Sequence, residues 1–181
     1  GAQTQCVRNT HNVQHYWKVA EITGGGGEGG QIVFFGTTDY TGNGHNKQAA
    51  RTTLVIRCLT NNQLGGIYWT ESGEYSATND IRWKYTGSNN VYEIWIKKGA
   101  YDNVVPHITG SFDYAQTFGS TTNSSSAPSG STAFENVFKI KMKDGAEPAI
   151  NINNEGIITY PSRPCFHGGN IAHDSSGIVE Y

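Results

Sequence analysis

The sequence predicts an all-β fold, built as an antiparallel β-sandwich or jelly roll. Short stretches of alternating polar and apolar residues recur about every ten residues, with turn residues between them, as is typical of sandwich strands. The composition agrees, because 23 glycines and abundant Thr, Asn and Ser favour strands and turns over long helices. At 181 residues the chain is long enough for one domain with a sizeable core.

The predicted strands follow one another along most of the chain after a polar lead-in at 1–14. We expect strands at residues 16–22, 31–35, 52–59, 66–70, 80–85, 92–97, 103–108, 111–117 and 134–143, and a last hairpin within 149–160. The sandwich domain is therefore predicted to cover 15–160, with a long polar loop at 119–132. Residues 161–181 have two prolines and no core pattern, which predicts a linker or the start of a further module.

The glycine run at 24–30 could suggest a phosphate-binding loop. It leads into a predicted strand rather than a helix, and a phosphate loop needs the helix. Glycine accepts positive φ freely, so we expect a flexible turn.

Alternation within the strands separates the expected core from the surface. Leu54, Ile56 and Cys58 share one side of their strand, and Trp83 lies on the same face as Ile81 and Tyr85. In the late strand we expect Phe138, Ile140 and Met142 to point inward, and Lys139, Lys141 and Lys143 to form a solvated face.

Charge and cysteine usage exclude several classes of function. The net charge is −2 and only 15% of residues are charged, which argues against capture of nucleic acid or anionic membranes. No signal peptide is apparent, and no apolar run is long enough for membrane insertion. Cys6, Cys58 and Cys165 show no CxxC spacing, and a core of this size needs no disulfides, so free thiols are expected.

The strand at 92–97 carries the least expected residue. Ile94 and Ile96 lie on one side of it, and Trp95 lies on the other side between Glu93 and Lys97. A tryptophan among charges is expected to be exposed in the isolated chain and to touch something. We expect a subunit interface first, with a ligand platform or a locally covered core position as alternatives.

Other aromatic residues are further binding candidates, because one core of this size cannot hide all of them. Aromatic rings stack on the C–H faces of sugars and also anchor protein interfaces. Tyr40 and His45 lie on a polar, glycine-containing loop of the kind that binds ligands. The remaining candidates are Trp69, Tyr75 and Tyr101.

No residue pattern specifies a reaction, so the chain is not expected to be an enzyme or to need a cofactor. A glycosidase needs two carboxyl groups facing one bond, and the spacing of Glu71, Glu74, Asp80, Asp102 and Asp113 singles out no pair. Cys165, His167 and His173 could offer zinc ligands, but their spacing matches no standard site, and residues clustered by chance in a coil are the stronger interpretation.

Two stretches resemble a known family. The segments YWKVAEI, TTLVIRCL, DIRWKYTG and VYEIWIKKGAYDNVVPHI resemble, across residues 16–118, the β-sandwich modules near the C-terminal ends of bacteriophage tail fibre and tailspike proteins. NNEGIITYPSRPCFHGGN resembles a tail-fibre junction that has two prolines and a Phe at fixed offsets and that often precedes a trimeric tip. Cys165 departs from this junction, which usually has a small residue such as Ala there.

The resemblance implies a homotrimeric virion component that recognises a bacterial surface polysaccharide or an outer-membrane protein. It also implies a non-catalytic module, since tailspike depolymerases usually carry their sites on an upstream β-helix, and this chain lacks the repeats of such a helix. Three alternatives stay open: the C-terminal accessory domain of a depolymerising tailspike, a free-standing lectin domain, and a purely structural assembly domain.

Overall fold

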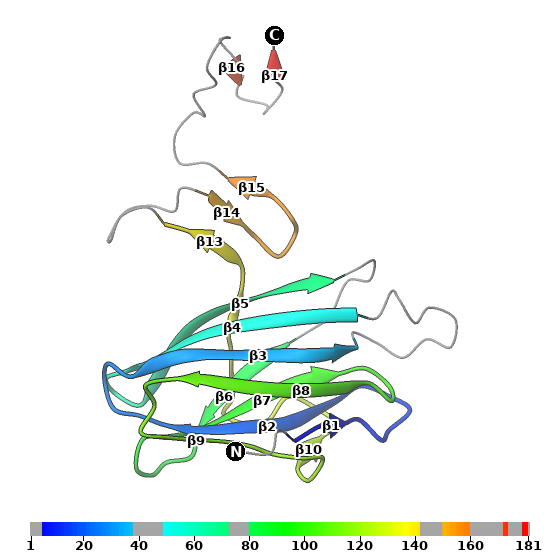
Figure 1. Ribbon diagram of the computed structural model, residues 1–181, viewed down its shortest axis with the longest axis vertical. Helices are drawn as coiled ribbons and strands as arrows, with labels where there is room; N and C mark the ends of the chain where they lie inside the picture. Colours follow the sequence, from blue (N-terminus) through cyan, green and yellow to red (C-terminus); the bar gives the residue numbers. More distant parts are fainter. Residues whose placement is uncertain are drawn as a thin grey trace. The chain divides into compact units, whose positions relative to one another are not determined.

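The structure of the chain is a computed structural model that describes residues 5–37, 49–72, 80–141, 150–159, 172–173 and 179–180. The chain divides into two units, residues 1–136 and residues 137–181. The first sheet of unit 1 has the order β1-β8-β3-β4-β5-β12 (Figure 1). Its strands are β1 (Val7–Arg8), β8 (Asn103–Gly110), β3 (Gly29–Thr37), β4 (Ala49–Leu59), β5 (Gln63–Ser72) and β12 (Glu135–Asn136).

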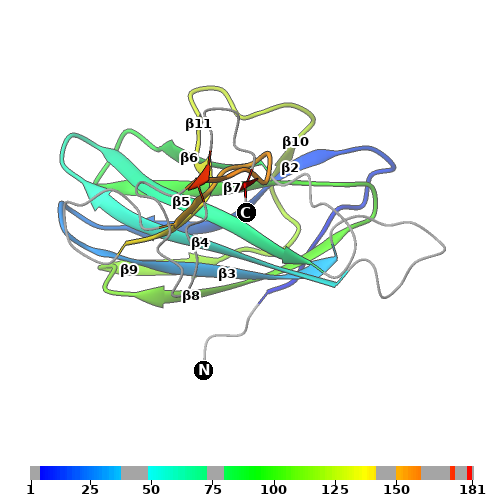
Figure 2. The same ribbon diagram turned by 90° about the horizontal axis from the view of Figure 1, so that it is seen from above.

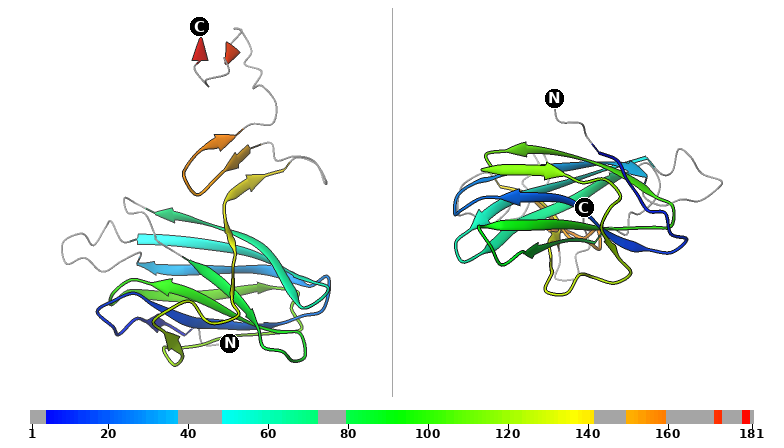
Figure 3. Two further views of the ribbon diagram at one scale, coloured as in Figure 1. Left: turned by 180° about the vertical axis from the view of Figure 1, so that it is seen from behind. Right: turned by 90° about the horizontal axis from the view of Figure 1, so that it is seen from below.

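The second sheet of unit 1 has the order β10-β2-β7-β6-β11, and β9 also pairs with β2 (Figure 3). Its strands are β10 (Asn123–Ser124), β2 (His15–Thr23), β7 (Val91–Lys98), β6 (Ile81–Tyr85), β11 (Thr132–Ala133) and β9 (Tyr114–Thr117). Adjacent strands in both sheets pair antiparallel, except that β12 runs parallel to β5. The described chain is therefore all-β and compatible with the predicted β-sandwich.

The core of unit 1 contains the apolar residues that the alternation placed inside. Leu54, Ile56 and Cys58 are at most 2% exposed, as predicted, and so are Ile94 and Ile96. Two partly buried aromatic residues, Trp83 and Tyr85, pack against this cluster. Burial of apolar surface at about 25 cal/mol per Å² is the main favourable contribution to folding.

Two pairs of consecutive asparagines make the tight turns of unit 1. Asn61 and Asn62 have φ of 66° and 58° between β4 and β5, and Asn89 and Asn90 have φ of 52° and 56° between β6 and β7. Asparagine tolerates this left-handed region better than other non-glycine residues, so these dipeptides suit the hairpin turns. The second turn joins the two strands that were expected at residues 80–85 and 92–97, which pair antiparallel as β6 and β7.

Buried polar groups attach the segment around Asn9 to the rest of unit 1. The side-chain amide of the fully buried Asn9 donates to the carbonyls of Gly99 at 2.6 Å and Val13 at 2.9 Å. The backbone N–H of Asn9 donates to the carbonyl of Asp102 at 2.8 Å. Asp102 itself forms a buried ion pair with Lys98 at 2.6 Å. Within the segment expected as a lead-in, Val7 and Arg8 thus pair with β8 as β1, and Asn9 is buried in unit 1.

The polar segment expected as a long surface loop at 119–132 also makes regular contacts with the second sheet. Its β10 pairs with β2 at one edge, and β11 pairs with β6 at the opposite edge. Figure 2 shows the connection between β10 and β11 outside β6 and β7, on the side away from β3 and β4. Pro128 in this connection is buried, so part of the low-complexity segment packs against the sandwich.

Unit 2 begins at Val137, whereas the sequence placed the end of the sandwich domain at residue 160. It contains β13 (Phe138–Ile140), β14 (Ile150–Ile152) and β15 (Ile158–Thr159) in one antiparallel sheet, and β16 (Ala172–His173) paired with β17 (Val179–Glu180). The predicted last hairpin is present. Its turn is held by the Asn153 side-chain oxygen, which accepts from the backbone N–H groups of Glu155 at 3.0 Å and Ile157 at 2.9 Å.

The alternation expected for residues 134–143 is only partly realised. Ile140 was expected inside but is 38% exposed, because β13 is three residues long and pairs with β14 alone. Met142 and Lys143 lie outside the described residues. Among the described residues, no helix is long and apolar enough to cross a membrane.

Candidate functional site: a groove at the edge of the sandwich

A shallow groove of about 440 Å³ lies at one edge of unit 1, between β5 of the first sheet and β6 of the second. We call it the edge groove. It is lined by two aromatic residues, Trp83 and Phe134, and by three polar residues, Gln63, Thr132 and Glu135. The remaining lining residues are small or aliphatic: Leu64, Gly65, Gly66 and Ala133.

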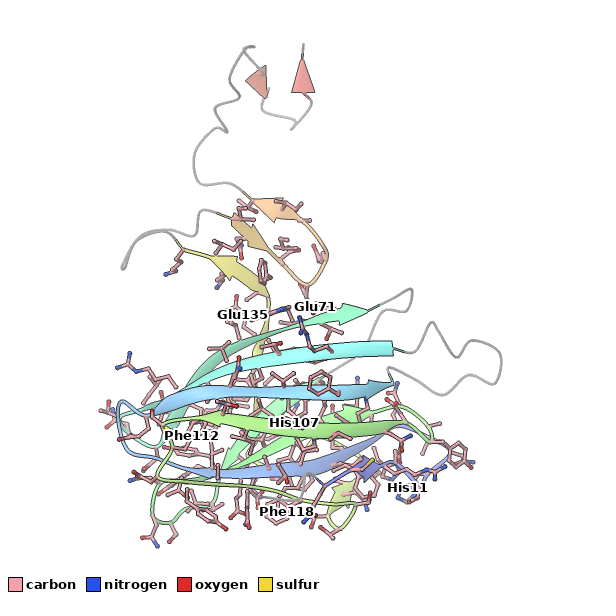
Figure 4. All side chains as sticks on the ribbon, in the orientation of Figure 1. His11, Glu71, His107, Phe112, Phe118 and Glu135 are labelled. Atoms are coloured by element: carbon pink, nitrogen blue, oxygen red, sulfur yellow. The ribbon has the colours of Figure 1, made fainter. Side chains whose placement is uncertain are left out.

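Residues 132–135 form one wall of the groove, and with Asn136 they join the two sheets; we call the segment 132–136 the edge bridge. Thr132 pairs with Trp83 of β6, and Glu135 pairs with Ile67 of β5 (Figure 4 labels Glu135). Between these pairs, the backbone N–H of Phe134 donates to the carbonyl of Ile81 at 2.9 Å. The Phe134 side chain is 6% exposed and belongs to the core cluster. The edge bridge therefore closes the sandwich at this edge and anchors itself with one buried ring.

Gly66, near the start of β5, leaves space beside this ring. A Cβ atom at Gly66 would meet the backbone carbonyl of Val55 and the Phe134 ring, the latter at 3.1 Å. A side chain at this position would therefore displace Phe134 or the strand, because close-packed interiors have little room to adjust. The glycine at position 66 therefore lets the edge bridge approach β5 closely.

A second connection between the sheets comes from Tyr68 of β5. This residue is 4% exposed, and burial, followed by the nearby Asp80 charge, raises the pKa of its phenol to about 12. A hydrogen bond with the backbone of Ile81 acts in the opposite direction. Tyr68 thus reaches from the first sheet to β6, which helps to fix the distance between the two walls.

The edge groove combines an aromatic ring that can stack on a ligand with side chains that can form hydrogen bonds. The Trp83 ring packs against Tyr92 at 6.1 Å between centroids and 71° between planes, which restricts its orientation. Gln63 and Glu135 are exposed at the groove and offer an amide and a carboxylate. An aromatic face combined with a few polar groups is suited to a sugar ring, which has an apolar C–H face and hydroxyls at its rim.

The edge groove offers a single carboxyl group. Glycoside hydrolysis uses two carboxyl groups on either side of the scissile bond. Glu135 is the one acidic residue among those that line the groove. The lining residues therefore supply groups for binding and lack the carboxylate pair of a glycosidase.

Trp95, the leading candidate from the sequence, is not exposed. Its ring is 6% exposed, which corrects the prediction of an exposed tryptophan. Register places it on the outer face of the second sheet between Lys18 of β2 and Arg82 of β6. Its indole N–H donates to the carboxylate of Glu93 at 3.0 Å. The third alternative, a locally covered residue, therefore describes Trp95 in the single chain.

The charged neighbours of Trp95 are held by one another. Lys18 Nζ lies 2.9 Å from Glu21, 3.5 Å from Glu93 and 4.4 Å from the centre of the Phe118 ring (Figure 4 labels Phe118). On β6, Arg82 binds Asp80 at 2.8 Å, and this pairing is the largest cause that raises the pKa of Arg82. This outer face is thus an internally paired polar layer rather than a free contact surface.

Of the other predicted binding residues, Tyr101 and Trp69 lie in the described part of the chain. Tyr101 is 43% exposed and has a φ of 56° in the turn between β7 and β8, whereas Trp69 is half-buried on β5. Tyr40, His45 and Tyr75 lie outside the described residues, as do the suggested metal ligands Cys165 and His167. For His173 only the backbone is described, in β16. Within the described ranges no group of three potential metal ligands occurs.

Sequence reasoning missed the apolar outer face of the first sheet. Phe35 and Val55 are 44% and 42% exposed there, and the Phe35 ring meets His107 edge-on at 5.3 Å (Figure 4 labels His107). Register places Val33 and Trp69 on the same face. The run of apolar residues at 32–35 could have indicated this face. A strand that is buried on one face only is expected to alternate apolar and polar residues.

The edge groove was missed as well. Trp83 was correctly placed on the core side of its strand, but the sequence did not indicate that β6 lies near an open edge. Glu135 and Gln63 are far apart in the chain and carry no pattern of their own. Only the sheet order brings them to one groove.

Comparison with known proteins adds a structural likeness. No protein-family model matches the chain, and no curated protein matches it. The fold is similar to that of a solved structure described as follows: Pantoea stewartii WceF is a glycan biofilm modifying enzyme with a bacteriophage tailspike-like parallel β-helix fold. The TM-score is 0.61 at 12% sequence identity, over 92% of this chain and 27% of that one. The likeness therefore concerns the fold alone and about a quarter of that enzyme's length.

Proposed function

We propose that the chain is a non-catalytic module of a phage tail fibre or tailspike-like protein, and that it contacts a glycan on the bacterial surface. The observation that carries this proposal is the edge groove, where Trp83 lies beside Gln63 and Glu135. The fold likeness to part of a tailspike-like, glycan-modifying enzyme supports a phage-like, glycan-related role. A module of this kind faces outward on a virion and uses weak sites whose avidity comes from multiple copies.

Two alternative functions share the glycan contact but place the chain in a different parent protein. As the accessory domain of a depolymerising tailspike, the chain would bind the glycan that an adjoining domain cleaves. As a free-standing lectin, it would use the same groove without an assembly. The single carboxylate of the edge groove favours binding over hydrolysis in both cases.

The test is an array of capsule and lipopolysaccharide oligosaccharides, probed with the full 181-residue chain. Binding to at least one glycan is expected, and Gln63→Ala and Glu135→Ala should each weaken it, by about fivefold for the neutral hydrogen bond of Gln63 and about tenfold or more for the charge-assisted one of Glu135. Gln31→Ala is the matched control, because Gln31 is exposed on the outer face of the first sheet. No glycan bound would overturn the proposal, and release of reducing ends would overturn its non-catalytic part.

We further propose a homotrimer, with contact between copies made by the apolar outer face around Phe35 and Val55 rather than by Trp95. These two side chains are the most exposed of the described apolar residues on that face, and exposed apolar patches mark interaction sites. Light scattering should give three times the chain mass of 19.7 kDa. Val55→Lys should reduce the mass to that of one chain, and a monomeric parent chain would contradict the proposal.

A further inference from the structure

We infer that the edge groove selects glycans that carry N-acetylated sugars; this inference rests on the proposed glycan-binding function. The acetamido group of such a sugar contains a carbonyl acceptor, an N–H donor and an apolar methyl group. At the groove, β5 presents backbone groups that suit a single amide, and an aliphatic surface lies beside them.

The direction of the backbone groups in β5 follows from those of its neighbour β4. The Cys58 N–H donates to the carbonyl of Glu28 at 2.8 Å, and the Cys58 carbonyl accepts from the N–H of Gly27 at 3.1 Å. Both groups of Cys58 thus point toward the segment that leads into β3. Backbone groups alternate sides along a strand, so the N–H and carbonyl of the preceding residue, Arg57, point toward β5.

Two residues of β5 point their backbone groups toward the groove. Arg57 pairs with Gly65, so the N–H and carbonyl of Gly65 point back to β4. The same alternation turns the backbone groups of Leu64 and Gly66 to the opposite edge of β5, and both residues line the groove. Gly66 has no side chain that could cover these groups, and a glycine within a strand often marks a place where a ligand approaches the backbone.

The edge bridge leaves this part of the β5 edge open. Within the described part of the chain, β12 is the strand that pairs with this edge, and its register covers Ile67 and Tyr68. Two residues before β12, the edge bridge lies against the other sheet, because Ala133 pairs with Arg82 of β6. The next position of the ladder between β5 and β12, opposite Gly65, is therefore available to a ligand.

The length of this open edge favours an amide on a sugar over a peptide strand. It is bounded by the turn at Asn61 and Asn62 on one side and by the start of the β12 pairing at Ile67 on the other. A peptide that adds a strand to a sheet forms a row of backbone hydrogen bonds along the edge. Between these limits the backbone groups of Leu64 and Gly66 face the groove, which is enough for one amide carbonyl and a neighbouring hydroxyl.

The surroundings of this position suit the rest of such a sugar. The acetamido carbonyl can accept from the Gly66 N–H, and a hydroxyl beside it can donate to the Leu64 carbonyl. The acetyl methyl group can lie against Ala133, which is exposed and lines the groove. The pyranose ring can stack on Trp83, whose orientation is restricted by Tyr92. A sugar with a hydroxyl in place of the acetamido group would lose the carbonyl acceptor and the methyl contact.

The experiment compares two uncharged oligosaccharides that differ in this group. Chitotetraose and cellotetraose share their linkage and ring stereochemistry, and chitotetraose carries an acetamido group in place of one hydroxyl on each ring. Both are titrated against the full 181-residue chain by calorimetry. Chitotetraose should bind at least about fivefold more tightly, the effect of one neutral hydrogen bond.

A variant at Ala133 assigns the preference to the groove. Ala133→Leu places a larger side chain where the acetyl methyl group would lie, and it should reduce the preference for chitotetraose to about twofold or less. Ala115→Leu is the matched control, because Ala115 is exposed on β9 and does not line the groove. An unchanged preference in Ala133→Leu would show that the acetamido group does not bind in the groove.

Amide hydrogen exchange tests the backbone contact directly. The Gly66 N–H should exchange quickly in the free chain and more slowly with chitotetraose bound, and cellotetraose should protect it less. Leu54 lies in the middle of β4, between β3 and β5, and its amide should be protected in all three samples. Slow exchange of the Gly66 N–H in the free chain would show that this group already has a partner, and would overturn the inference.

The titrations separate this inference from the proposed function. Equal or tighter binding of cellotetraose would overturn the inference while the glycan-binding function stands. Failure to bind chitotetraose at about 10 mM, tenfold above the Kd of a millimolar site, would also overturn the inference. Absence of binding to every glycan of the array would overturn the proposed function as well.

Discussion

At the scale of single residues, what each side chain does depends on neighbours that are distant in sequence. Trp95 stands among charged residues in its strand, yet its ring is 6% exposed and its N–H is bound to Glu93. Cys58 follows its strand pattern and lies fully buried. Both residues are therefore expected to act through stability rather than through contact with a ligand.

Replacement of Trp95 should destabilise the fold. Trp95→Ala should lower the free energy of unfolding by about 3–5 kcal/mol, as for other large buried side chains. Trp95→Phe should cost less, because it retains most of the packing and loses the hydrogen bond to Glu93. Urea unfolding followed by circular dichroism measures both values. An unchanged unfolding midpoint in Trp95→Ala would show that the ring is exposed.

Cys58 should make the fold sensitive to high pH. Burial is the main cause that raises the pKa of its thiol from 9.0 to about 11, and the nearby charges of Glu28 and Asp113 add to the shift. The folded state keeps the proton that the unfolded state loses above pH 9.0. The resulting stability is fully present below pH 9 and is lost as the pH rises toward 11. The melting temperature should therefore fall across this interval.

Tyr68 extends the same trend, because the pKa of its phenol is raised to about 12. Cys58→Ala should reduce the fall in melting temperature between pH 9 and 11, and the exposed Cys6 provides the control substitution Cys6→Ala.

The two thiols should also differ in reactivity. In a Cys165→Ser background, Cys6 should react quickly with a thiol reagent at pH 8, and Cys58 should react only after unfolding. Rapid modification of both thiols in the folded chain would contradict the prediction.

At the scale of elements, the edge bridge at residues 132–136 is the segment on which the candidate site depends. It pairs with β6 through β11 and with β5 through β12, so it is bound to both sheets at once. Short strands of two residues form few hydrogen bonds, and the buried Phe134 supplies the remaining stabilisation. Loss of this ring should release the bridge from the groove wall.

A matched pair of phenylalanine substitutions tests this role. Phe134→Ala should lower the free energy of unfolding by about 3–5 kcal/mol and should abolish glycan binding, because the groove loses one wall. In the Val55→Lys background, which is expected to be monomeric, Phe35→Ala removes a ring that is 44% exposed and should cost about 1 kcal/mol or less. Calorimetry and glycan titration give the two quantities. Unchanged glycan binding by a folded Phe134→Ala chain would show that the edge bridge is not part of the binding site.

At the scale of the whole molecule, the chain consists of two units whose boundary lies at Asn136 and Val137. The residues of both sheets and of the edge groove lie within residues 1–136. Unit 2 has its own short strands and its own hairpin turn. The sandwich is therefore expected to fold without residues 137–181.

A chain that ends at residue 136 provides the measurement. It should show a cooperative thermal transition, because it retains the apolar core cluster, and it should bind the same glycans as the full chain. Light scattering on the shortened chain then reports whether the sandwich alone assembles. Loss of cooperative unfolding would show that unit 2 is required for the fold.

The sequence by itself determined the fold class and much of the core. Alternation placed Leu54, Ile56 and Cys58 inside because side chains of a strand point to opposite faces, and the turn residues marked where strands end. It did not determine that Trp95 is covered, or that Gln63, Trp83 and Glu135 line one groove. These features depend on which strands are neighbours. Strand order results from pairing between distant segments, which local periodicity does not encode, and only the tertiary structure decided it.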